Sequence, residues 1–246
     1  MEAILDKATK KKLGSFYSPA VLANYLASKA NEYFHRDKES LSFLDPAVGD
    51  GELLKAMFKM RQDTTETYIG VDIDENALDN TRIRLGEAGV DCFLFNDDAL
   101  NPKTIPSING WDYIKFRSNI EEIDCIISNP PWGADISIGQ KDLTTFKTAI
   151  GQYDIYDLFI EKSIDILSMG GVYAFIVPDS IFRKEHKPVR KILLKSTSIK
   201  LIARLGEFFF EGVNTPVSII IGIKGYTPNN ICLLYTSPSP RDMRRS

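Results

Sequence analysis

The residues best suited to chemistry form the tetrapeptide Asn129-Pro130-Pro131-Trp132, which directly follows the apolar run at residues 123–128. Two consecutive prolines make a rigid turn with few hydrogen-bond donors. Such a turn presents the amide of Asn129, the carbonyl oxygen of Pro130 and the broad ring of Trp132. Two acceptors on the hydrogens of an exocyclic amine push its nitrogen towards a tetrahedral, nucleophilic geometry while the attached ring stacks on the tryptophan. The tetrapeptide therefore predicts direct group transfer to such a nitrogen, although an Asn-Pro turn beside a core tryptophan would have the same sequence.

A second set of candidates consists of acids that follow three apolar runs. The first acid, Asp45, opens a turn in which Gly49 and Gly51 let the backbone approach a ligand closely. Asp72 ends the next run, 27 residues after Asp45, where an acid can accept hydrogen bonds from both ribose hydroxyls of a nucleoside. Asp98 follows the third run and can accept from an adenine amino group.

The charge of the first turn, residues 45–51, discriminates between ligands. This turn lacks the glycine spacing of a dinucleotide-binding motif, and Asp45 would repel a pyrophosphate. A carboxylate favours a cation such as the ammonium group of a methionine moiety. S-adenosylmethionine therefore fits these charges better than NAD does. Each acid alone could be a helix N-cap or a solvated loop residue, but three acids at successive strand ends indicate one ligand site.

The elements that must position these residues alternate along the chain. Val- and Ile-rich runs separated by helical patterns indicate a parallel, doubly wound α/β sheet that is buried on both faces. Ligands of such sheets bind outside the carboxyl ends of the strands, where the candidates cluster. Strands are predicted at residues 41–45, 67–74, 91–95, 123–128, 172–178, 199–205 and 216–223, and helices at 21–34, 51–60, 75–85, 154–168 and 180–194.

The last two predicted helices have recognisable ends, and the second is basic. Gly170 and Gly171 should stop the helix at 154–168. Pro188 should break or restart the helix at 180–194. The basic side chains of this second region could contact phosphates or form a solvated helix face; they are Lys184, Lys187, Arg190, Lys191 and Lys195.

The composition restricts the class of protein. The 246 residues include three cysteines without a CxxC motif and two distant histidines, which argues against a disulfide scaffold and a metal site. No apolar run reaches the roughly 18 residues of a membrane span, and the N-terminus has no signal-peptide pattern. We therefore expect a soluble, cytoplasmic protein without a membrane partner. The net charge of −3 gives no overall polybasic character, although charge can be sorted onto one face.

The motifs together resemble those of N6-adenine DNA methyltransferases with the amino-first (gamma) motif order, found in restriction–modification and phage-defence systems. Residues 14–19, GSFYSP, are similar to the family's N-terminal cofactor motif, and residues 45–51 and 129–132 are similar to its cofactor turn and catalytic tetrapeptide. Trp132 stands where the family more often has tyrosine or phenylalanine. The resemblance covers residues 12–225. It implies a Rossmann-like, S-adenosylmethionine-dependent methyltransferase fold, with a mostly parallel seven-stranded sheet and an antiparallel last strand.

The resemblance also assigns the site residues and implies no metal. The catalytic residues would be Asn129, Pro130, Pro131 and Trp132, and the base would stack on Trp132 and on Phe210, which lies in a run of three phenylalanines. The residues that bind S-adenosylmethionine would be Phe16, Tyr17, Ser18, Pro19, Asp45, Pro46, Ala47, Gly49, Gly51, Asp72, Ile73, Asp98 and Ala99.

The implied function is methyl transfer from S-adenosylmethionine to the N6 amino group of adenine in double-stranded DNA. The adenine would be flipped out of the duplex, which costs a few kcal/mol. The implied partners are DNA and a nuclease, a specificity subunit or a fused domain. Three alternatives stay open: a protein glutamine methyltransferase, an RNA adenine methyltransferase and a non-catalytic cofactor-binding remnant. The motif at residues 14–19 and Trp132 favour nucleic acid over glutamine.

The C-terminal residues 232–246 differ from the rest of the chain. The eleven residues from Cys232 to Asp242 match the translation of a transposase adapter used in sequencing libraries, with an ordinary Pro/Ser linker as the alternative. We expect residues 1–231 to form the catalytic domain, with a cofactor-motif helix at 12–36 and a sheet domain at 41–226. Residues 232–246 are expected to be a non-native tail outside the fold. The target-recognition region that normally follows the catalytic domain is expected to be missing.

Overall fold

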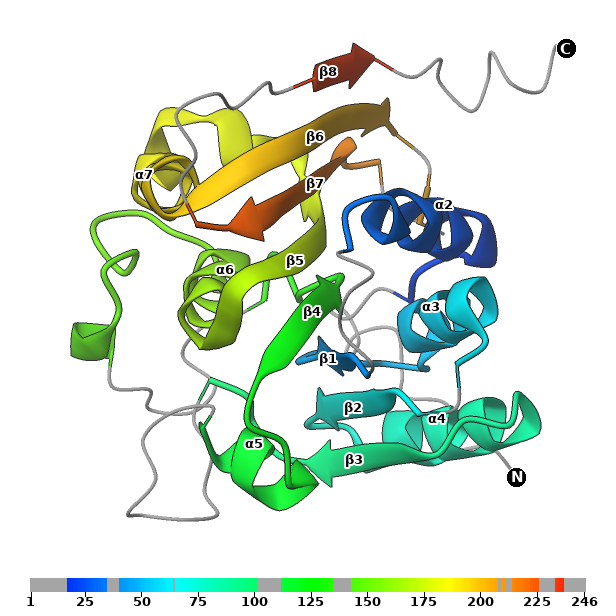
Figure 1. Cartoon of the computed structure of the whole chain (residues 1–246). Helices are drawn as coiled ribbons and strands as arrows, with labels where there is room; N and C mark the ends of the chain where they lie inside the picture. Colours follow the sequence, from blue (N-terminus) through cyan, green and yellow to red (C-terminus); the bar gives the residue numbers. More distant parts are fainter. Residues whose placement is uncertain are drawn as a thin grey trace, which may run out of the picture.

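The structure is a computed structural model of the whole chain (Figure 1). It describes residues 17–34, 40–63, 65–100, 112–134, 143–207, 209–210 and 214–225, and the backbone of a strand at 233–236.

Strands and helices alternate through most of the described chain. The strands are β1 (Ser42–Asp45), β2 (Thr67–Asp72), β3 (Cys92–Asn96), β4 (Ile123–Ser128), β5 (Leu167–Pro178), β6 (Thr197–Gly206), β7 (Val217–Lys224) and β8 (Leu233–Thr236). The α-helices are α2 (Ala20–Asn31), α3 (Glu52–Arg61), α4 (Glu75–Glu87), α5 (Asp112–Ser118), α6 (Ile155–Ile166) and α7 (Lys187–Ser196). Short 3-10 helices are η1 (Leu143–Thr145), η2 (Asp179–Phe182) and η3 (Lys184–His186).

All strands join one sheet in the order β3-β2-β1-β4-β5-β7-β6-β8. Neighbouring strands from β3 to β5 are parallel, and β7 runs antiparallel to both β5 and β6. Apart from β8, this is the predicted mostly parallel, seven-stranded sheet with an antiparallel last strand. The predicted fold class is therefore confirmed.

The edge strand β8 is a difference from the sequence-based expectation. It comes from the tail at residues 232–246, which we expected to lie outside the fold, and it pairs in parallel with β6. The outer edge of β6 would otherwise present unpaired backbone donors and acceptors. The segment Leu-Leu-Tyr-Thr is apolar and suited to an extended conformation, so it can satisfy that edge whatever its origin.

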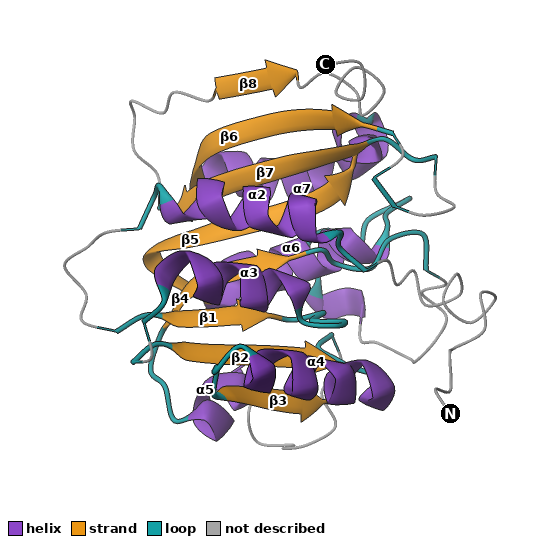
Figure 2. Cartoon of the chain, turned by 90° about the vertical axis from the view of Figure 1, so that its right-hand side faces the viewer, coloured by secondary structure: helices purple, strands orange, loops and turns teal. Residues whose placement is uncertain are grey.

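The sheet lies between two layers of helices. Helices α2, α3 and α4 cover one face, and α5, α6 and α7 cover the other (Figures 1 and 2). All six residues of the central strand β4 are buried, as expected for a parallel strand with helices on both faces. Among the described residues, none of the helices is long and apolar enough to cross a membrane.

The glycine pair at 170–171 does not stop a helix as predicted. Helix α6 ends at Ile166, and β5 begins at the next residue. The pairing of β5 with β4 then shifts, because Leu167 lies opposite Ile123 whereas Val172 lies opposite Cys125. The intervening residues leave the regular ladder, and Gly170 makes this possible with a φ of +80°.

Two prolines set the starts of helices. Pro19 precedes α2 with a φ of −59°, and residues 17–19 are not helical because a residue before proline avoids the helical conformation. The predicted helix at 12–36 therefore begins at Ala20; residues 12–16 and 35–36 lie outside the described residues. Pro188 lies in the first turn of α7, so it starts this helix rather than breaking one.

Candidate active site

The carboxylate of Asp45 joins the first strand to the tetrapeptide. Asp45 ends β1 and is 1% exposed. Its Oδ1 accepts hydrogen bonds from the Ser128 hydroxyl at 2.7 Å and from the Ala47 N–H at 3.1 Å. Burial raises the pKa of this carboxyl to about 7. Because Ser128 precedes Asn129, the predicted cofactor turn and the predicted catalytic tetrapeptide share one buried hydrogen-bond network.

Two glycines shape the turn after β1. Gly49 has a φ of +53° and Gly51 has a φ of +78°. The Gly49 N–H donates to Asp72 Oδ2 at 2.8 Å, and the Thr81 hydroxyl donates to the Gly49 carbonyl at 2.7 Å. A Cβ at Gly51 would lie 2.7 Å from the Thr81 methyl carbon. The turn is therefore held closely against β2 and α4, and Pro46 within it is buried.

The acids at the ends of β2 and β3 lie side by side. The two oxygens of Asp72 accept from Gly49 N–H and from Asp74 N–H, and burial raises the pKa of this carboxyl. The Asp97 N–H donates to the Asp72 carbonyl at 3.0 Å, which fixes the end of β3 beside the end of β2. Asp98 accepts from the Leu100 N–H at 3.0 Å and is partly exposed.

The apolar neighbours of these acids differ in exposure. Ile73 is 51% exposed beside Asp72, so it can pack on a flat ligand. Ala99 is buried after Asp98, which makes it a wall of the site rather than a side chain that reaches into it.

The N-terminal motif reaches both halves of the site. A ring carbon of Tyr17 lies 3.2 Å from where a Cβ at Gly49 would be, so the ring covers the glycine turn. Burial and the carboxylates of Asp74, Asp50 and Asp72 raise the pKa of Tyr17. Ser18 Oγ accepts from Asn129 Nδ2 at 3.3 Å. Phe16 lies outside the described residues, and Pro19 is partly exposed at the start of α2.

The tetrapeptide brings its amide and its aromatic ring together. Asn129 is partly exposed, and its Oδ1 accepts from the indole Nε1 of Trp132 at 3.4 Å. Pro130 is buried and Pro131 is partly exposed. Trp132 is 6% exposed and meets the ring of Phe210 edge to face, with ring centroids 5.8 Å apart. The two predicted base-stacking rings are therefore neighbours, and in this structure they contact each other.

An anchor of the tetrapeptide was not predicted from the sequence. The Gly133 N–H donates to both carboxylate oxygens of Asp154, each at 3.1 Å. Asp154 caps α6 and forms a capping box with Asp157, whose Oδ2 lies 2.7 Å from His186 Nδ1. The Asp-x-x-Asp spacing before α6 is a readable capping signal. The bond to Gly133 joins residues 21 positions apart and has no local sequence signal.

The acids around the cofactor turn make the site negative. Asp45, Asp50 and Asp72 all have pKa values raised mainly by burial, and Arg84, 3.2 Å from Asp50, offsets part of the charge. A buried site with surplus carboxylate favours a cationic ligand. The glycine backbone, the ribose acceptor Asp72 and this charge fit S-adenosylmethionine, which carries an ammonium and a sulfonium group.

The fold and this site define an S-adenosylmethionine-dependent methyltransferase fold. The methyltransferase subunit of a type I restriction-modification system from Streptococcus thermophilus has this fold, with a TM-score of 0.69, 23% identity, and coverage of 90% of this chain and 47% of that chain.

The family is defined more narrowly by sequence. The family described as Eco57I restriction-modification methylase matches residues 66–210, more than half of the chain. The chain belongs to this family, which also implies S-adenosylmethionine as the cofactor.

Two curated relatives agree with this assignment. Type II methyltransferase M.VspI of Vibrio sp. (strain 343) is 30% identical over 204 residues, which cover 82% of this chain and 46% of the relative. Type II methyltransferase M.BanIII of Aneurinibacillus aneurinilyticus is 27% identical over 254 residues, which cover 94% of this chain and 43% of the relative. The chain thus spans about half the length of the curated relatives it matches.

Proposed function

We propose that this chain is the catalytic part of an S-adenosylmethionine-dependent DNA methyltransferase of a restriction–modification system, and that it methylates adenine at N6. The observation that carries the proposal is the position of Asn129. Its amide lies between Ser18 of the N-terminal motif and Trp132, and it follows the Ser128 side chain that binds Asp45. The order of the motifs along the chain supports the amino-first class.

The cofactor would lie against the turn at residues 45–51, with its ribose on Asp72, its adenine near Ile73, Asp98 and Ala99, and Tyr17 covering the methionine side. When bound, S-adenosylmethionine supplies a methyl group activated by a positively charged sulfur. The negative site would hold its ammonium group.

The target amine would be held by two acceptors. Asn129 Oδ1 and the Pro130 carbonyl oxygen can each accept one hydrogen of the adenine N6 amino group. One partner of Asn129 Oδ1 is the Trp132 indole at 3.4 Å, a long hydrogen bond that the amine can replace. Two acceptors localise the nitrogen lone pair and aim it at the methyl group, and the proton released after transfer leaves through the same acceptors to solvent.

Adenine in a duplex would first be flipped out, at a cost of a few kcal/mol. Stacking on an aromatic side chain returns about 1–3 kcal/mol per base. Trp132 and Phe210 would supply this stacking after separating, since their ring centroids lie 5.8 Å apart in an edge-to-face contact. We also propose that the whole protein recognises a DNA sequence through a target-recognition region. It would act together with a nuclease or a specificity subunit.

The experiment separates chemistry from cofactor binding. Asn129→Ala in the full chain should keep S-adenosylmethionine affinity by calorimetry and lose adenine methylation by roughly 100-fold or more, because one of the two acceptors is gone. Asp79→Ala, an exposed change on α4, is the control. Turnover of Asn129→Ala within a few-fold of the parent would contradict the role of the tetrapeptide.

A further inference from the structure

A basic surface begins next to the proposed site. We define the α7 basic surface as the exposed side chains of Arg183, Lys184, Lys187, Lys191 and Lys195. The stretch of residues 182–195 holds six basic residues and one acidic residue, in a chain whose net charge is −3. Positive charge is therefore concentrated here while the rest of the chain is more acidic than its total suggests.

The packing of α7 keeps the lysines of the α7 basic surface exposed. Lys187, Lys191 and Lys195 are four residues apart and share one helix face. Val189 and Leu193 lie on the other face and are buried against the sheet. The lysines are thus directed away from the core by the packing of α7.

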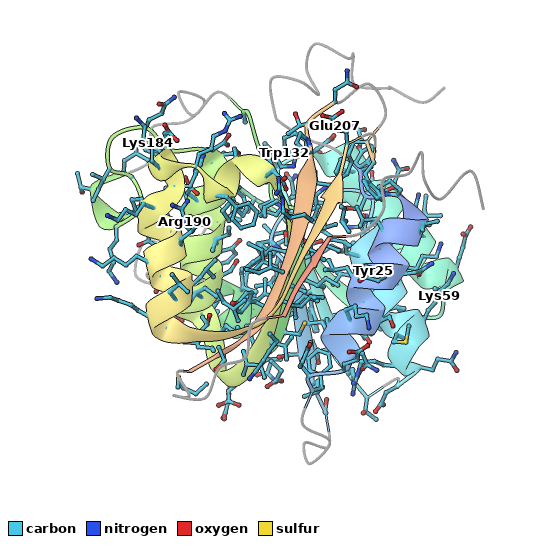
Figure 3. All side chains as sticks on the ribbon, turned by 90° about the horizontal axis from the view of Figure 1, so that it is seen from above. Tyr25, Lys59, Trp132, Lys184, Arg190 and Glu207 are labelled. Carbon is cyan, nitrogen blue, oxygen red and sulfur yellow. The ribbon has the colours of Figure 1, made fainter. Side chains whose placement is uncertain are left out.

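One end of the surface lies at the catalytic edge of the sheet. Strand β5 is parallel to β4, so Pro178 at the end of β5 and Asn129 directly after β4 lie at the same edge of the sheet. The helices η2 and η3 follow at that edge, and α7 then runs back along the sheet. Figure 3 shows Lys184 and Trp132 at the same end of the molecule, with Lys59 on the opposite side of the sheet. Lys191 and Lys195 lie progressively farther away, at about 1.5 Å per residue.

Buried contacts join this end to the tetrapeptide. His186 lies between Lys184 and Lys187 in the sequence, its ring stacks on Tyr156 with centroids 5.0 Å apart, and its Nδ1 lies 2.7 Å from Asp157 Oδ2. Asp157 shares a capping box with the residue that anchors Gly133. The basic residues at 183–187 are therefore fixed relative to Trp132 rather than carried on an independent loop.

The basic side chains of this region differ in their partners. Arg190 donates to the carbonyl oxygens of Ile181 and Arg183. It therefore stabilises the η2–η3 turn, and we do not assign it to phosphate binding. Among the residues that the structure describes, the ion pairs include neither Lys184 nor Lys187. With respect to the part of the chain that the structure describes, these two ammonium groups can therefore bind an external anion without first breaking an ion pair.

We propose that Arg183, Lys184 and Lys187 contact the phosphates of the DNA strand that flanks the target adenine. The inference rests on the proposed function, which supplies a polyanion at the neighbouring tetrapeptide. The sequence left two roles open for these basic residues, phosphate contact and a solvated helix face. We assign the first role to the residues at the catalytic edge and the second to Lys191 and Lys195. Each phosphate contact releases condensed counterions and makes binding depend on salt.

The test compares two variants with the same loss of charge on neighbouring elements. Lys184→Gln/Lys187→Gln removes the edge pair, and Lys191→Gln/Lys195→Gln is the matched control. Binding of a fluorescent duplex with one mismatched adenine is measured by anisotropy at several salt concentrations, beginning at low salt. The edge variant should bind roughly tenfold or more weakly, and the slope of log K against log salt should fall by about 0.9 per lost contact. The control should keep the parent slope.

Equal losses in both variants, an unchanged slope in the edge variant, or no salt-dependent binding by the parent would overturn the inference. Cofactor calorimetry on the same variants should match the parent, which excludes unfolding as the cause. A parent that methylates adenine while the edge variant binds DNA normally refutes this inference alone. A parent that binds S-adenosylmethionine and methylates only a protein amide refutes the proposed function.

Discussion

Asp45 is a buried carboxyl whose negative charge a cationic ligand would stabilise. Its carboxyl is buried with a pKa raised to about 7, although two hydrogen bonds to the charged form oppose the shift. An aspartate in an unfolded chain has a pKa of about 3.9. The folded protein therefore binds this proton more tightly than the unfolded chain does. The associated stability is present below about pH 4 and is lost as the pH rises through about 7, by up to about 4 kcal/mol.

Asp45→Asn should separate stability from binding. The amide oxygen can still accept from Ser128 and Ala47, and the variant carries no buried charge. We expect a flatter dependence of urea stability on pH between 5 and 8, with stability at pH 8 equal to or above that of the parent. Affinity for S-adenosylmethionine should fall about tenfold, because the loss of about 1.4 kcal/mol of ammonium–carboxylate attraction corresponds to that factor.

Calorimetry and urea titration of Asp45→Asn and of the control Asp79→Asn test this pair of effects. A parent whose stability rises steadily between pH 5 and 8 because of this residue, or a variant with unchanged cofactor affinity, would show that the carboxylate is structural only.

At the scale of elements, Asp154 performs two tasks with one side chain. It caps α6, and it accepts hydrogen bonds from the N–H of Gly133, the residue that follows the tetrapeptide. Asp154→Ala should cost about 1–2 kcal/mol of stability through the lost cap and should lower kcat through a looser tetrapeptide. Asp154→Ser keeps a capping oxygen but is too short to bind Gly133 through two oxygens, so it should restore stability and leave kcat low. If Asp154→Ser restored both stability and kcat, Asp154 would act only as a helix cap.

The sequence predicted strands and their ends better than it predicted the links between them. Val- and Ile-rich runs that are buried on both faces, such as β4, are identifiable because burial needs a continuous apolar run. Asp45, Asp72 and Asn129 were predicted to meet because the carboxyl ends of parallel strands share an edge. The bonds from Ser18 to Asn129 and from Gly133 to Asp154 depend on chain segments that meet through the fold, and local patterns do not encode such distances.

Helix boundaries were less accurate for a related reason. Gly170 has the positive φ that typically ends a helix, yet the pairing of β4 with β5 uses that conformation for an irregular strand. The sequence predicts that this glycine adopts a positive φ. Whether that conformation ends a helix or interrupts a strand depends on pairing with the neighbouring strand.

At the scale of the whole molecule, different parts of the sheet carry different parts of the site. The parallel half, β3 to β4, ends in the acids and glycines of the cofactor site, and the strands after β5 bring Phe210 to the tetrapeptide. The far edge, β6 and β8, lies several strands from the cofactor turn. The positive charge of α7 and the negative charge of the cofactor turn lie on different elements. Under the proposed function, a cationic cofactor and an anionic substrate would therefore approach the same edge of the sheet from separate directions.

The most direct measurement is the identity of the methylated product. The full chain is incubated with methyl-labelled S-adenosylmethionine and a duplex that contains a single mismatched, easily extruded adenine, and the nucleosides are then separated by mass spectrometry. We predict labelled N6-methyladenine from the parent and none above background from Asn129→Ala. Label on cytosine, on RNA alone or on a protein amide, or no transfer by a parent that binds the cofactor and the duplex, would contradict it.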